Sequence, residues 1–421
     1  MPEEYISGLH ILPLYDEAAV EITVYSDVER PCTARMGLVV AQGETNRPFR
    51  MSVQGFTPWS PEKPHLYGFS VKMGEDMVES YFGMRKAELR EDENGIKRLF
   101  LNDKPYFHNG LLLNGKPYFH SGVLDQGYYP DGLYTAPSDE AMIADIQTMK
   151  DMGFNMLRKH IKIEPLRWYY HCDRLGMLVW QDMVNGGSAY KHWFVTYLAT
   201  LMNWNHISFS DDEKHAGLLS RLHPEGKDEF RREITETIAF LYNHPSIVVW
   251  VPFNEGWGQF DALAACEQIR TLDSSRLVDH ASGWFDQKGG DILSLHYYFL
   301  KLKFKPESKR AAALTEFGGY SLSIPGHSCC KKVYGYKKFN STGTLTYGYI
   351  DLIRQTILPA VKKGIGATVY TQLSDIEEET NGIYTYDREI CKIDPDTLRK
   401  WNRALKEAGE CKTYADHTTD H

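Results

Sequence analysis

The stretch Ile247-Val-Val-Trp-Val-Pro-Phe-Asn-Glu-Gly-Trp-Gly258 decides the fold of this chain. Its first five residues are apolar and mostly β-branched, which is typical of a strand buried on both faces of a parallel sheet. The run then ends abruptly in Asn254 and Glu255. A carboxylate at the end of a buried strand is costly unless it is paired, hydrogen-bonded or used for chemistry. Glu255 therefore needs a partner elsewhere in the chain, and Glu316 is the candidate.

Strand and helix patterns alternate on both sides of this stretch, from about residue 118 onward. Strands are expected near 118–124, 155–160, 176–182, 247–251, 276–280, 291–297, 311–316 and 366–372. Helices are expected near 138–152, 165–175, 228–243, 261–270, 346–362 and 395–408. Eight strands in roughly 300 residues match the count and size of a (β/α)8 barrel. The alternative, a doubly wound open sheet, would favour a Gly-x-Gly-x-x-Gly loop after its first strand, and that motif is absent there.

The first 90 residues have a different pattern, with short strands separated by turn residues. Val20-Glu-Ile-Thr-Val24 alternates with period two, and a turn cluster occupies 43–48. We expect a small β-sandwich over 1–90, a hairpin linker over 91–117 and the barrel over 118–421. The linker region contains a repeat, because Leu-Asn-Asp-Lys-Pro-Tyr-Phe-His-Asn-Gly at 101–110 recurs as Leu-Asn-Gly-Lys-Pro-Tyr-Phe-His-Ser-Gly at 113–122. We have no functional account of this repeat.

The overall composition excludes several classes of protein. Hydrophobic residues make up 42% and charged residues 24% of the 421, which is ordinary for a globular protein. The net charge of -9 argues against nucleic acid as a partner, because nucleic-acid binding usually needs a basic face. We expect no membrane partner, because no apolar run is long enough to span a bilayer. The seven cysteines lack zinc-ligand spacing, and no secretory signal is visible, so we expect free thiols and a cytoplasmic protein.

Polar residues gather at the carboxyl ends of the expected barrel strands, where barrel enzymes place their active sites. In chain order they are Asp125, Gln126, Arg158, His160, Gln181, Asp182, Asn254, Glu255, His280, His296, Tyr297, Glu316 and Gln372. The two glutamates, at the ends of strands four and seven, suit glycoside hydrolysis, in which one carboxylic acid protonates the leaving oxygen and the other attacks the anomeric carbon. A carboxyl separation of about 5–5.5 Å predicts retention of anomeric configuration, and about 6.5–9.5 Å predicts inversion.

Several motifs carry a resemblance to a known family. They are Trp59-Ser-Pro-Glu, Phe82-Gly-Met-Arg85, Asn243-His-Pro-Ser-Ile-Val-Val-Trp250 followed by Asn254-Glu255, and Thr315-Glu316-Phe-Gly-Gly. In this order they resemble glycoside hydrolase family 2, the group of β-galactosidases, β-glucuronidases and β-mannosidases. The resemblance covers nearly the whole chain. It implies an α/β protein in which a small immunoglobulin-like β-sandwich precedes a (β/α)8 TIM barrel.

The resemblance also implies roles for individual side chains. Glu255 would be the acid/base and Glu316 the nucleophile, while Asn254 would bond the sugar 2-hydroxyl and Tyr297 would bond the nucleophile. Further substrate contacts are expected from Arg158, His160, Asp182, His296, Trp257, Trp284, Asp125 and Gln372. A buried ion pair with Asp182 is an equally good explanation for Arg158 and for His160. Core packing is an equally good role for the two tryptophans.

The sequence departs from the family pattern in three ways. Most members begin with a jelly-roll sugar-binding domain, whereas this sequence begins at the immunoglobulin-like domain. Asp125-Gln126 stands where many β-galactosidases carry a His-rich segment. The Asn-x-Lys motif of β-glucuronidases is not evident. We therefore expect the catalytic residues of family 2, within a substrate pocket that differs from that of most members.

These observations predict a retaining exo-β-glycosidase that hydrolyses terminal β-linked sugars by double displacement, with β-galactosidase as the leading specificity. The expected partner is an oligosaccharide or glycoside, and no organic cofactor is expected. The sequence contains no convincing set of metal ligands, which leaves a structural magnesium or sodium ion open. One alternative is a catalytically weakened carbohydrate-binding fragment that lacks its first domain. Another is a metal-dependent barrel hydrolase. The segment 185–227 is expected either to cover the functional end of the barrel or to form an interface in a homo-oligomer.

Overall fold

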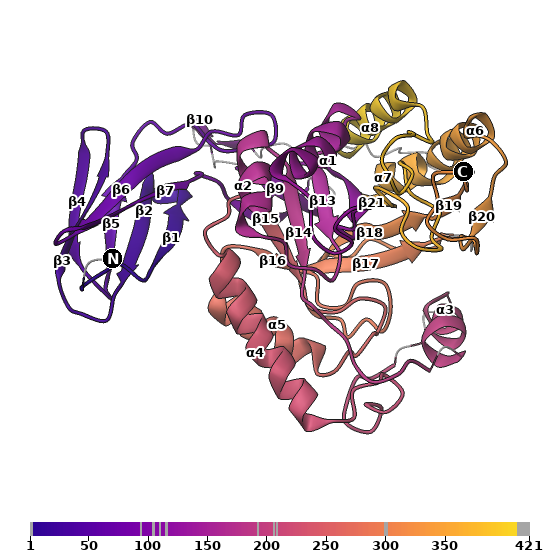
Figure 1. The fold of residues 1–421 in the computed structure, drawn as a ribbon, viewed down its shortest axis with the longest axis horizontal. Coiled ribbons are helices and arrows are strands. Elements are labelled where there is room, and N and C mark those ends of the chain that lie inside the picture. Colours follow the sequence, from indigo (N-terminus) through magenta and orange to yellow (C-terminus); the bar gives the residue numbers. More distant parts are fainter. Residues whose placement is uncertain are drawn as a thin grey trace.

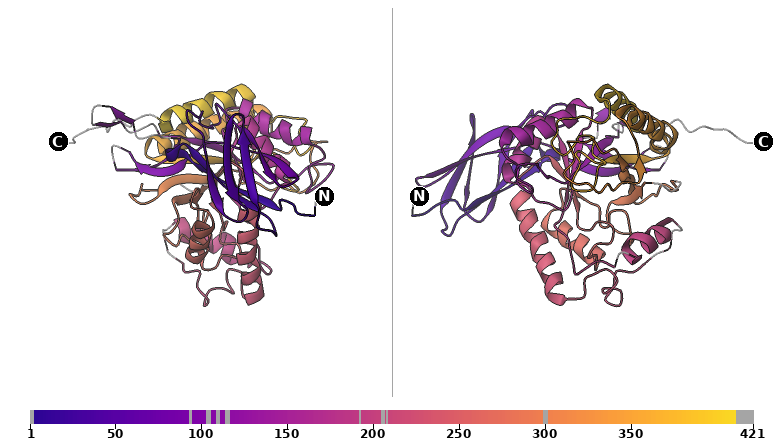
Figure 2. Two further views of the ribbon diagram at one scale, coloured as in Figure 1. Left: turned by 90° about the vertical axis from the view of Figure 1, so that its left-hand side faces the viewer. Right: turned by 45° about the vertical axis from the view of Figure 1, so that its right-hand side comes forward.

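The computed structural model describes residues 3–92, 95–102, 106–108, 111–113, 117–191, 193–204, 207, 209–298 and 302–410. In Figure 1 the amino-terminal strands form a sandwich at one side of the molecule, and a parallel barrel surrounded by helices follows. The rotated views in Figure 2 show the same sandwich projecting from the barrel. The expectation of an immunoglobulin-like sandwich followed by a TIM barrel is confirmed.

The sandwich consists of two antiparallel sheets. One sheet contains β1 (Gly8–Leu14), β2 (Ala19–Tyr25) and β5 (Pro48–Ser52), and the other contains β3 (Pro31–Met36), β4 (Val39–Glu44), β6 (Tyr67–Met73) and β7 (Asp76–Phe82). The alternating pattern of β2 explains the arrangement, because Val20, Ile22 and Val24 are fully buried while the residues between them are partly exposed. Burial of every second residue gives the sandwich its own apolar core.

Two further antiparallel strand pairs lie between the sandwich and the barrel. They are β8 (Ala87–Glu91) with β9 (Lys97–Leu101), and β10 (Tyr106–His108) with β11 (Leu111–Leu113). Leu99 of β9 joins the apolar cluster inside the barrel, so this pair packs against the barrel interior. The repeat identified in the sequence falls partly outside the described residues, at 103–105, 109–110 and 114–116.

The barrel is a sheet of eight parallel strands. They are β12 (His120–Asp125), β13 (Met156–Lys159), β14 (Leu178–Asp182), β15 (Ile247–Val251), β16 (Leu277–Val278), β17 (Ile292–Tyr297), β18 (Ala311–Gly318) and β21 (Ile365–Thr371). The strand order is β16-β15-β14-β13-β12-β21-β18-β17. The barrel is nearly closed between its two end strands, where the backbone N–H of Asp291, directly before β17, donates to the carbonyl of Val278 in β16 at 2.7 Å.

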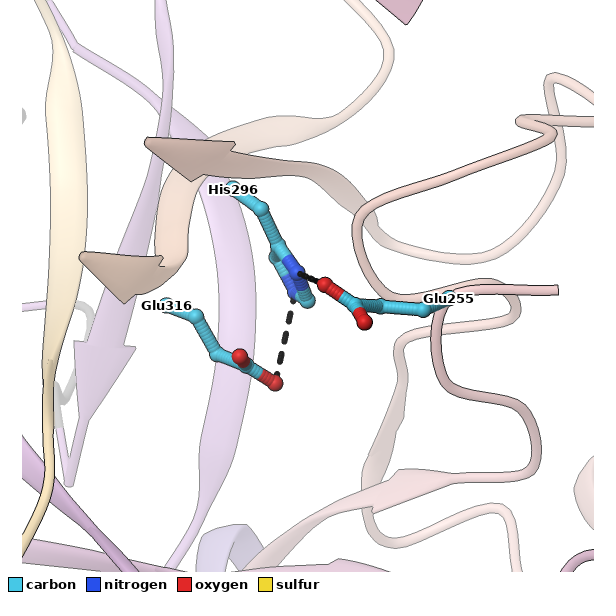
Figure 3. Close-up of side chains that lie close together, drawn as sticks. All are labelled: Glu255, His296 and Glu316. Carbon is cyan, nitrogen blue, oxygen red and sulfur yellow. Dashed lines mark hydrogen bonds and ion pairs between the residues drawn. The ribbon is translucent and has the colours of Figure 1, made fainter. Parts of the chain in front are cut away.

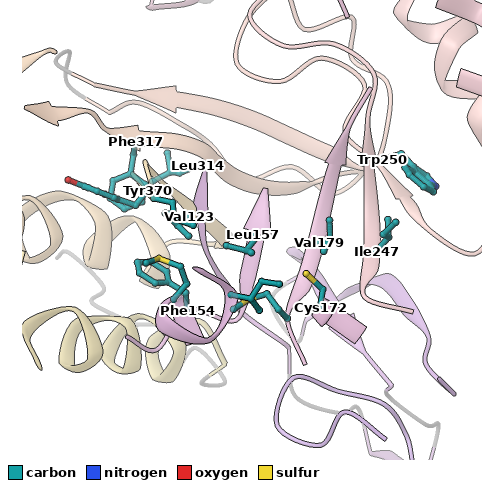
Figure 4. Close-up of a cluster of buried hydrophobic side chains, with 14 of the residues drawn as sticks. Val123, Phe154, Leu157, Cys172, Val179, Ile247, Trp250, Leu314, Phe317 and Tyr370 are labelled. Atoms are coloured by element: carbon teal, nitrogen blue, oxygen red, sulfur yellow. The ribbon is translucent and has the colours of Figure 1, made fainter. Parts of the chain in front are cut away.

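Alternate residues of the strands face two separate apolar cores. Val123, Leu157 and Val179 point outward to the helices, as Figure 4 shows, and Phe154 packs with them. Their neighbours Leu124, Met156, Leu178 and Trp180 belong to the cluster inside the barrel. Both faces of each strand are therefore buried, which explains the continuous apolar runs in the sequence.

The helices that cover the strands are α1 (Asp139–Asp151), α2 (Leu166–Leu175), α4 (Pro224–Leu241), α5 (Ala262–Leu272), α6 (Thr342–Leu352), α7 (Leu358–Lys362) and α8 (Pro395–Glu410). Ser138 caps α1 by accepting a bond from the backbone N–H of Ala141 at 3.3 Å. α4 begins earlier than expected because Pro224 occupies its first turn, a position that tolerates proline. The helix expected at 346–362 is interrupted by a π-helix, Ile353–Ile357.

The strand–helix alternation is incomplete in the second half of the barrel. Within the described residues, no helix lies between β16 and β17 or between β17 and β18. The short strands β19 (Tyr320–Ser321) and β20 (Lys337–Lys338) follow β18 instead of a direct helix. No described helix combines the length and the apolar character needed to cross a membrane.

The long segment 185–227 contains a π-helix, Trp193–Leu198, and α3 (Ala199–Trp204). Figure 1 shows α3 apart from α1, α2, α7 and α8. Phe194 and Leu219 from this segment pack with Trp284 and Phe285, which follow β16. This cluster anchors the segment at the carboxyl ends of the barrel strands.

Candidate active site

A cavity of about 1210 Å³ lies at the carboxyl ends of the barrel strands. Asn254, Glu255, His296 and Glu316 are among the residues that line it. They follow or end β15, β17 and β18, so the sheet brings together side chains that lie more than 60 residues apart in the chain. This is the end of the barrel at which TIM-barrel enzymes carry their catalytic groups.

His296 lies between the two glutamates, as Figure 3 shows. Its Nδ1 atom is 2.8 Å from Oε1 of Glu255, and its Nε2 atom is 3.7 Å from Oε1 of Glu316. One carboxylate oxygen of each glutamate and a histidine nitrogen all lie within 4.8 Å of one another. The two carboxyl groups are therefore close enough to act on the two atoms of a single bond in a bound substrate.

The backbone at Glu255 turns sharply out of the strand. Glu255 has a φ of 50°, in the left-handed region, and its N–H donates to the carbonyl of Ser282 at 2.9 Å. Gly256 follows with a φ of 71°, and a Cβ there would lie 2.3 Å from the ring of Phe285. Only glycine suits that position, so the glycine after the acid in the sequence is needed to turn the chain.

Burial changes the protonation of the two groups that share the 2.8 Å contact. It raises the pKa of Glu255 to about 7, although His160 and Arg158 oppose this rise. Burial lowers the pKa of His296 to about 4, although Glu316 opposes this fall. At neutral pH His296 is uncharged and a substantial fraction of Glu255 carries a proton. The site thus contains a carboxylic acid able to donate a proton near pH 7.

Glu316 is held by donors from two sides. Arg158 donates from Nη1 to Oε1 at 3.1 Å, and the hydroxyl of Tyr298 donates to Oε2. Arg158 also binds both oxygens of Asp182 at 3.0 Å and donates to Oδ1 of Asn254 at 2.8 Å. A fully buried arginine with these partners keeps Glu316 and Asn254 in fixed orientations.

The bond to Glu316 that we expected from Tyr297 is made by Tyr298 in the structure. Side chains alternate between the two faces of a strand, so His296 and Tyr298 share one face and Tyr297 points to the other. Tyr297 packs against the outer apolar core, although it also contributes to the cavity wall. The period-two rule, applied from His296, would have identified the correct tyrosine.

The other predicted residues divide into two groups. His160, Trp257 and Trp284 line the cavity together with the residues already described. The indole of Trp257 contacts the ring of Tyr190 with centroids 4.4 Å apart. The ring of Trp284 contacts that of His296 at 5.5 Å.

Asp125, Asp182 and Gln372 lie buried behind the cavity wall rather than in it. Asp125 binds Nζ of Lys159 at 2.7 Å, which explains why a carboxylate is tolerated there. Asp182 pairs with Arg158 and lies 2.9 Å from Nδ1 of His160, which is the ion-pair arrangement weighed in the sequence. The two aspartates and Gln372 are buried and are not among the residues that line the cavity, so their expected contact with the substrate stays a prediction.

Sequence reasoning missed part of the cavity wall. The missed residues include Tyr298, Tyr334, Tyr336, Glu379 and Asn381, with Val195, Tyr197 and Leu201 from the long segment. The run Glu377-Glu378-Glu379 after the eighth strand was a visible signal, because an acidic cluster at the carboxyl end of a barrel strand lies next to the active site.

The same three side chains that form the centre could also hold a metal ion. Glu255, His296 and Glu316 each offer one ligand atom, and carboxylate and imidazole ligands suit zinc and other divalent metals. Acid–base and metal-assisted hydrolysis are therefore both compatible with these residue types.

Comparisons with known proteins define the class. The TIM-barrel domain of glycosyl hydrolases family 2 matches residues 108–357, and a second glycosyl hydrolases family 2 domain matches residues 14–85. The chain belongs to glycoside hydrolase family 2, which confirms the resemblance found in the sequence. The matched domains are the immunoglobulin-like sandwich and the barrel, and neither match is to a jelly-roll domain.

Individual relatives differ in the sugars that their names mention. A β-galactosidase from Leuconostoc mesenteroides is 27% identical over 377 residues, which cover 85% of this chain and 31% of that protein. The chain thus spans about a third of the length of this relative. A β-D-glucuronidase from Dictyoglomus thermophilum has a TM-score of 0.70 at 14% identity, covering 96% of this chain and 69% of its own. A β-galacturonidase from Eisenbergiella tayi, bound to galacturonate, has a TM-score of 0.68 at 18% identity, covering 96% and 73%.

Proposed function

We propose that this chain is a retaining exo-β-glycosidase, with Glu255 as the acid/base and Glu316 as the nucleophile. The observation that carries the proposal is the short distance between the two carboxyl groups, which have oxygens within 4.8 Å of each other. Retaining glycosidases have carboxyl groups about 5–5.5 Å apart, whereas inverting enzymes need room for a water molecule between them.

In the first step, an oxygen of Glu316 attacks the anomeric carbon, and the bond from this carbon to the leaving oxygen breaks. Glu255 gives its proton to that oxygen, so the aglycone leaves as a neutral alcohol. Arg158 and Tyr298 hold Glu316 in position for the attack. Asn254, fixed by Arg158, would bond the sugar 2-hydroxyl.

In the second step, Glu255 acts as a base. It takes a proton from a water molecule, and the resulting oxygen attacks the anomeric carbon and releases Glu316. A carboxyl group whose pKa is raised to about 7 suits both directions, because it can give and take a proton near neutral pH.

A β-galactoside is the leading substrate in this proposal. Its support is the relative named β-galactosidase, which is more similar in sequence than the glucuronidase and galacturonidase with similar folds. The relevant experiment is release of nitrophenol from a panel of nitrophenyl β-glycosides, including the galactoside, glucoside, mannoside, glucuronide and galacturonide. Glu316→Gln should lower kcat by at least about 10⁴-fold, and proton NMR should show the β-anomer as the first product.

Two outcomes of this experiment would favour other functions. If wild type and Glu316→Gln are equally inactive on every glycoside while both stay folded, the chain is a carbohydrate-binding fragment and not an enzyme. If activity is present but is abolished by a chelator and restored by a divalent metal, the ligand set of Glu255, His296 and Glu316 supports metal-assisted hydrolysis.

A further inference from the structure

A polar wall of the cavity forms where the first and last strands of the barrel meet. Gln126 follows β12 and Gln372 follows β21, and these two strands are paired. Nε2 of Gln126 donates to Oε1 of Gln372 at 2.8 Å and to Oε2 of Glu379 at 3.1 Å. Nε2 of Gln372 donates to Oε2 of Glu379 at 2.7 Å and to Oδ1 of Asn381 at 2.8 Å. Two amide groups therefore fix the position of one carboxylate.

The carboxylate of Glu379 has one oxygen left for a ligand. Both amide donors bind Oε2, and within the described part of the chain no donor is found for Oε1. Glu379 is partly buried and lines the cavity, as do Gln126 and Asn381. A partly buried carboxylate oxygen without a protein donor needs hydroxyl or water donors, and a sugar diol supplies them.

The proposed mechanism determines which part of the substrate meets this wall. The leaving group must lie beside Glu255, which follows β15. The glycone must lie on the other side of Glu316, which belongs to β18, and β18 pairs with β21. The sugar ring that is attacked therefore extends toward Gln126 and Glu379. Glu379, which follows the eighth strand, therefore lies on the side of the cavity that receives the glycone.

The charges around the cavity also distinguish between kinds of glycone. Besides Glu255, which is partly protonated at neutral pH, and Glu316, which is paired with Arg158, the acidic residues in the described lining are Glu377, Glu378 and Glu379; the basic ones are His160, His296 and Lys303. His296 is uncharged at neutral pH. Arg158, the cation nearest the nucleophile, is fully buried and bound to Asp182, Glu316 and Asn254. A sugar carboxylate would therefore meet an excess of negative charge, whereas a neutral sugar would meet hydrogen-bond acceptors.

Resting on the glycosidase function above, we propose that Glu379 binds hydroxyl groups of the glycone and makes this site selective for neutral sugars over uronic acids. Gln126 and Gln372 act as positioning residues, because they orient the carboxylate through Oε2. The wall thus supplies specificity that the catalytic pair alone does not provide.

The test compares two substrates that differ only at C6, nitrophenyl β-galactoside and nitrophenyl β-galacturonide. We expect wild type to prefer the galactoside. Glu379→Gln keeps the shape of the side chain but removes its charge, and it should lower kcat/KM for the galactoside roughly 10- to 100-fold. The ratio of galacturonide to galactoside activity should rise in this variant, because a repulsive charge is lost. A merely structural defect would lower both activities together and leave their ratio unchanged.

The matched control is Glu389→Gln, which removes the same charge ten residues further along the chain. Glu389 does not line the cavity, and its side chain is 70% exposed. It should leave both activities and their ratio at the wild-type values. The proposal is overturned if wild type prefers the galacturonide, or if Glu379→Gln leaves the ratio of the two activities unchanged. Thermal melting of each variant shows whether the fold is intact, and Glu379→Asp, which retains the charge, should retain the preference for the galactoside.

A binding measurement separates this proposal from the glycosidase function. If wild type hydrolyses neither substrate, the proposed function fails, but titration with galactose and galacturonate, followed by NMR, still tests the wall. Galactose binding that is weakened in Glu379→Gln and unchanged in Glu389→Gln would support the role of Glu379. Equal binding of both sugars, or stronger binding of galacturonate to wild type, would refute it.

Discussion

Oε1 of Glu255 and Nδ1 of His296 lie 2.8 Å apart at the mouth of the barrel. Burial shifts the two pKa values in opposite directions, to about 7 for the carboxyl group and to about 4 for the imidazole. Between these values the pair contains one neutral histidine and one carboxylic acid. Burial therefore keeps a proton on the glutamate at a pH where an exposed glutamate would have lost it.

The rate of hydrolysis is expected to depend on this proton. The activity on a nitrophenyl glycoside should fall as pH rises through about 7, because Glu255 then loses the proton that the leaving oxygen needs. Glu255→Gln should remove this alkaline decline and retain more activity on dinitrophenyl than on nitrophenyl glycosides, since a good leaving group needs less help. Measurement of kcat against pH from 5 to 9 tests this. An unchanged decline in the variant would assign the titration to another group.

The same pKa shift predicts a pH-dependent effect on stability. The folded pKa of Glu255, about 7, is higher than its ordinary value of 4.5, so folding favours the protonated form. This contribution is complete below pH 4.5 and is lost as pH rises through 7. Glu255→Gln should thus be more stable than wild type at pH 8, by on the order of 3 kcal/mol, and closer to it at pH 4.5. Urea unfolding at both pH values measures the difference, and an equal difference at both would contradict the shift.

Tyr298→Phe removes the hydroxyl that donates to Oε2 of Glu316. A hydrogen bond to a charged group contributes about 1.5–3 kcal/mol, so kcat/KM should fall roughly 10- to 100-fold with little loss of stability. Tyr297→Phe provides the comparison, because its hydroxyl has no bond to Glu316 in the structure. A larger loss for Tyr297→Phe would favour the assignment based on sequence alone.

Arg158→Met should destabilise the fold strongly. Arg158 is fully buried, and its removal leaves Asp182 and Glu316 without their main cationic partner. Breaking a buried ion pair on one side costs about 3–5 kcal/mol. Arg232→Met is the control, because Arg232 is 65% exposed and lies 3.8 Å from Glu236, and such surface pairs contribute about 0–1 kcal/mol. Similar unfolding midpoints for the two variants would show that Arg158 contributes little to the free energy of unfolding.

Trp257→Ala should raise KM for nitrophenyl glycosides several-fold while leaving the fold intact. Trp257 lines the cavity two residues after the acid and stands beside Tyr190, so its ring offers a flat surface next to the leaving group. Trp193→Ala is the matched control, because Trp193 is 59% exposed and is not among the lining residues. Equal KM values for both variants would assign Trp257 to packing only.

The barrel was predictable because its signal is local and repeated. Runs such as Ile247–Val251 are apolar on both faces, and helices of suitable length separate most of them. The elements that were poorly predicted have weak local patterns. β16 is reduced to Leu277–Val278, and the expected helix near 346–362 changes to a π-helix at Ile353–Ile357. Neither feature follows from periodicity, because tertiary packing rather than intrinsic propensity decides it.

The sequence by itself determined that Glu255 and Glu316 would lie at the same end of a barrel. Parallel strands joined by right-handed crossovers place all carboxyl ends on one face, so the positions of two residues along their strands are sufficient. The tertiary structure decided which side chains complete the pair. Tyr298 rather than Tyr297 reaches Glu316, and Glu379 enters the cavity from a loop beyond the last strand. These contacts depend on which face a side chain occupies at a strand end and on the path of a loop, and both are set by long-range packing.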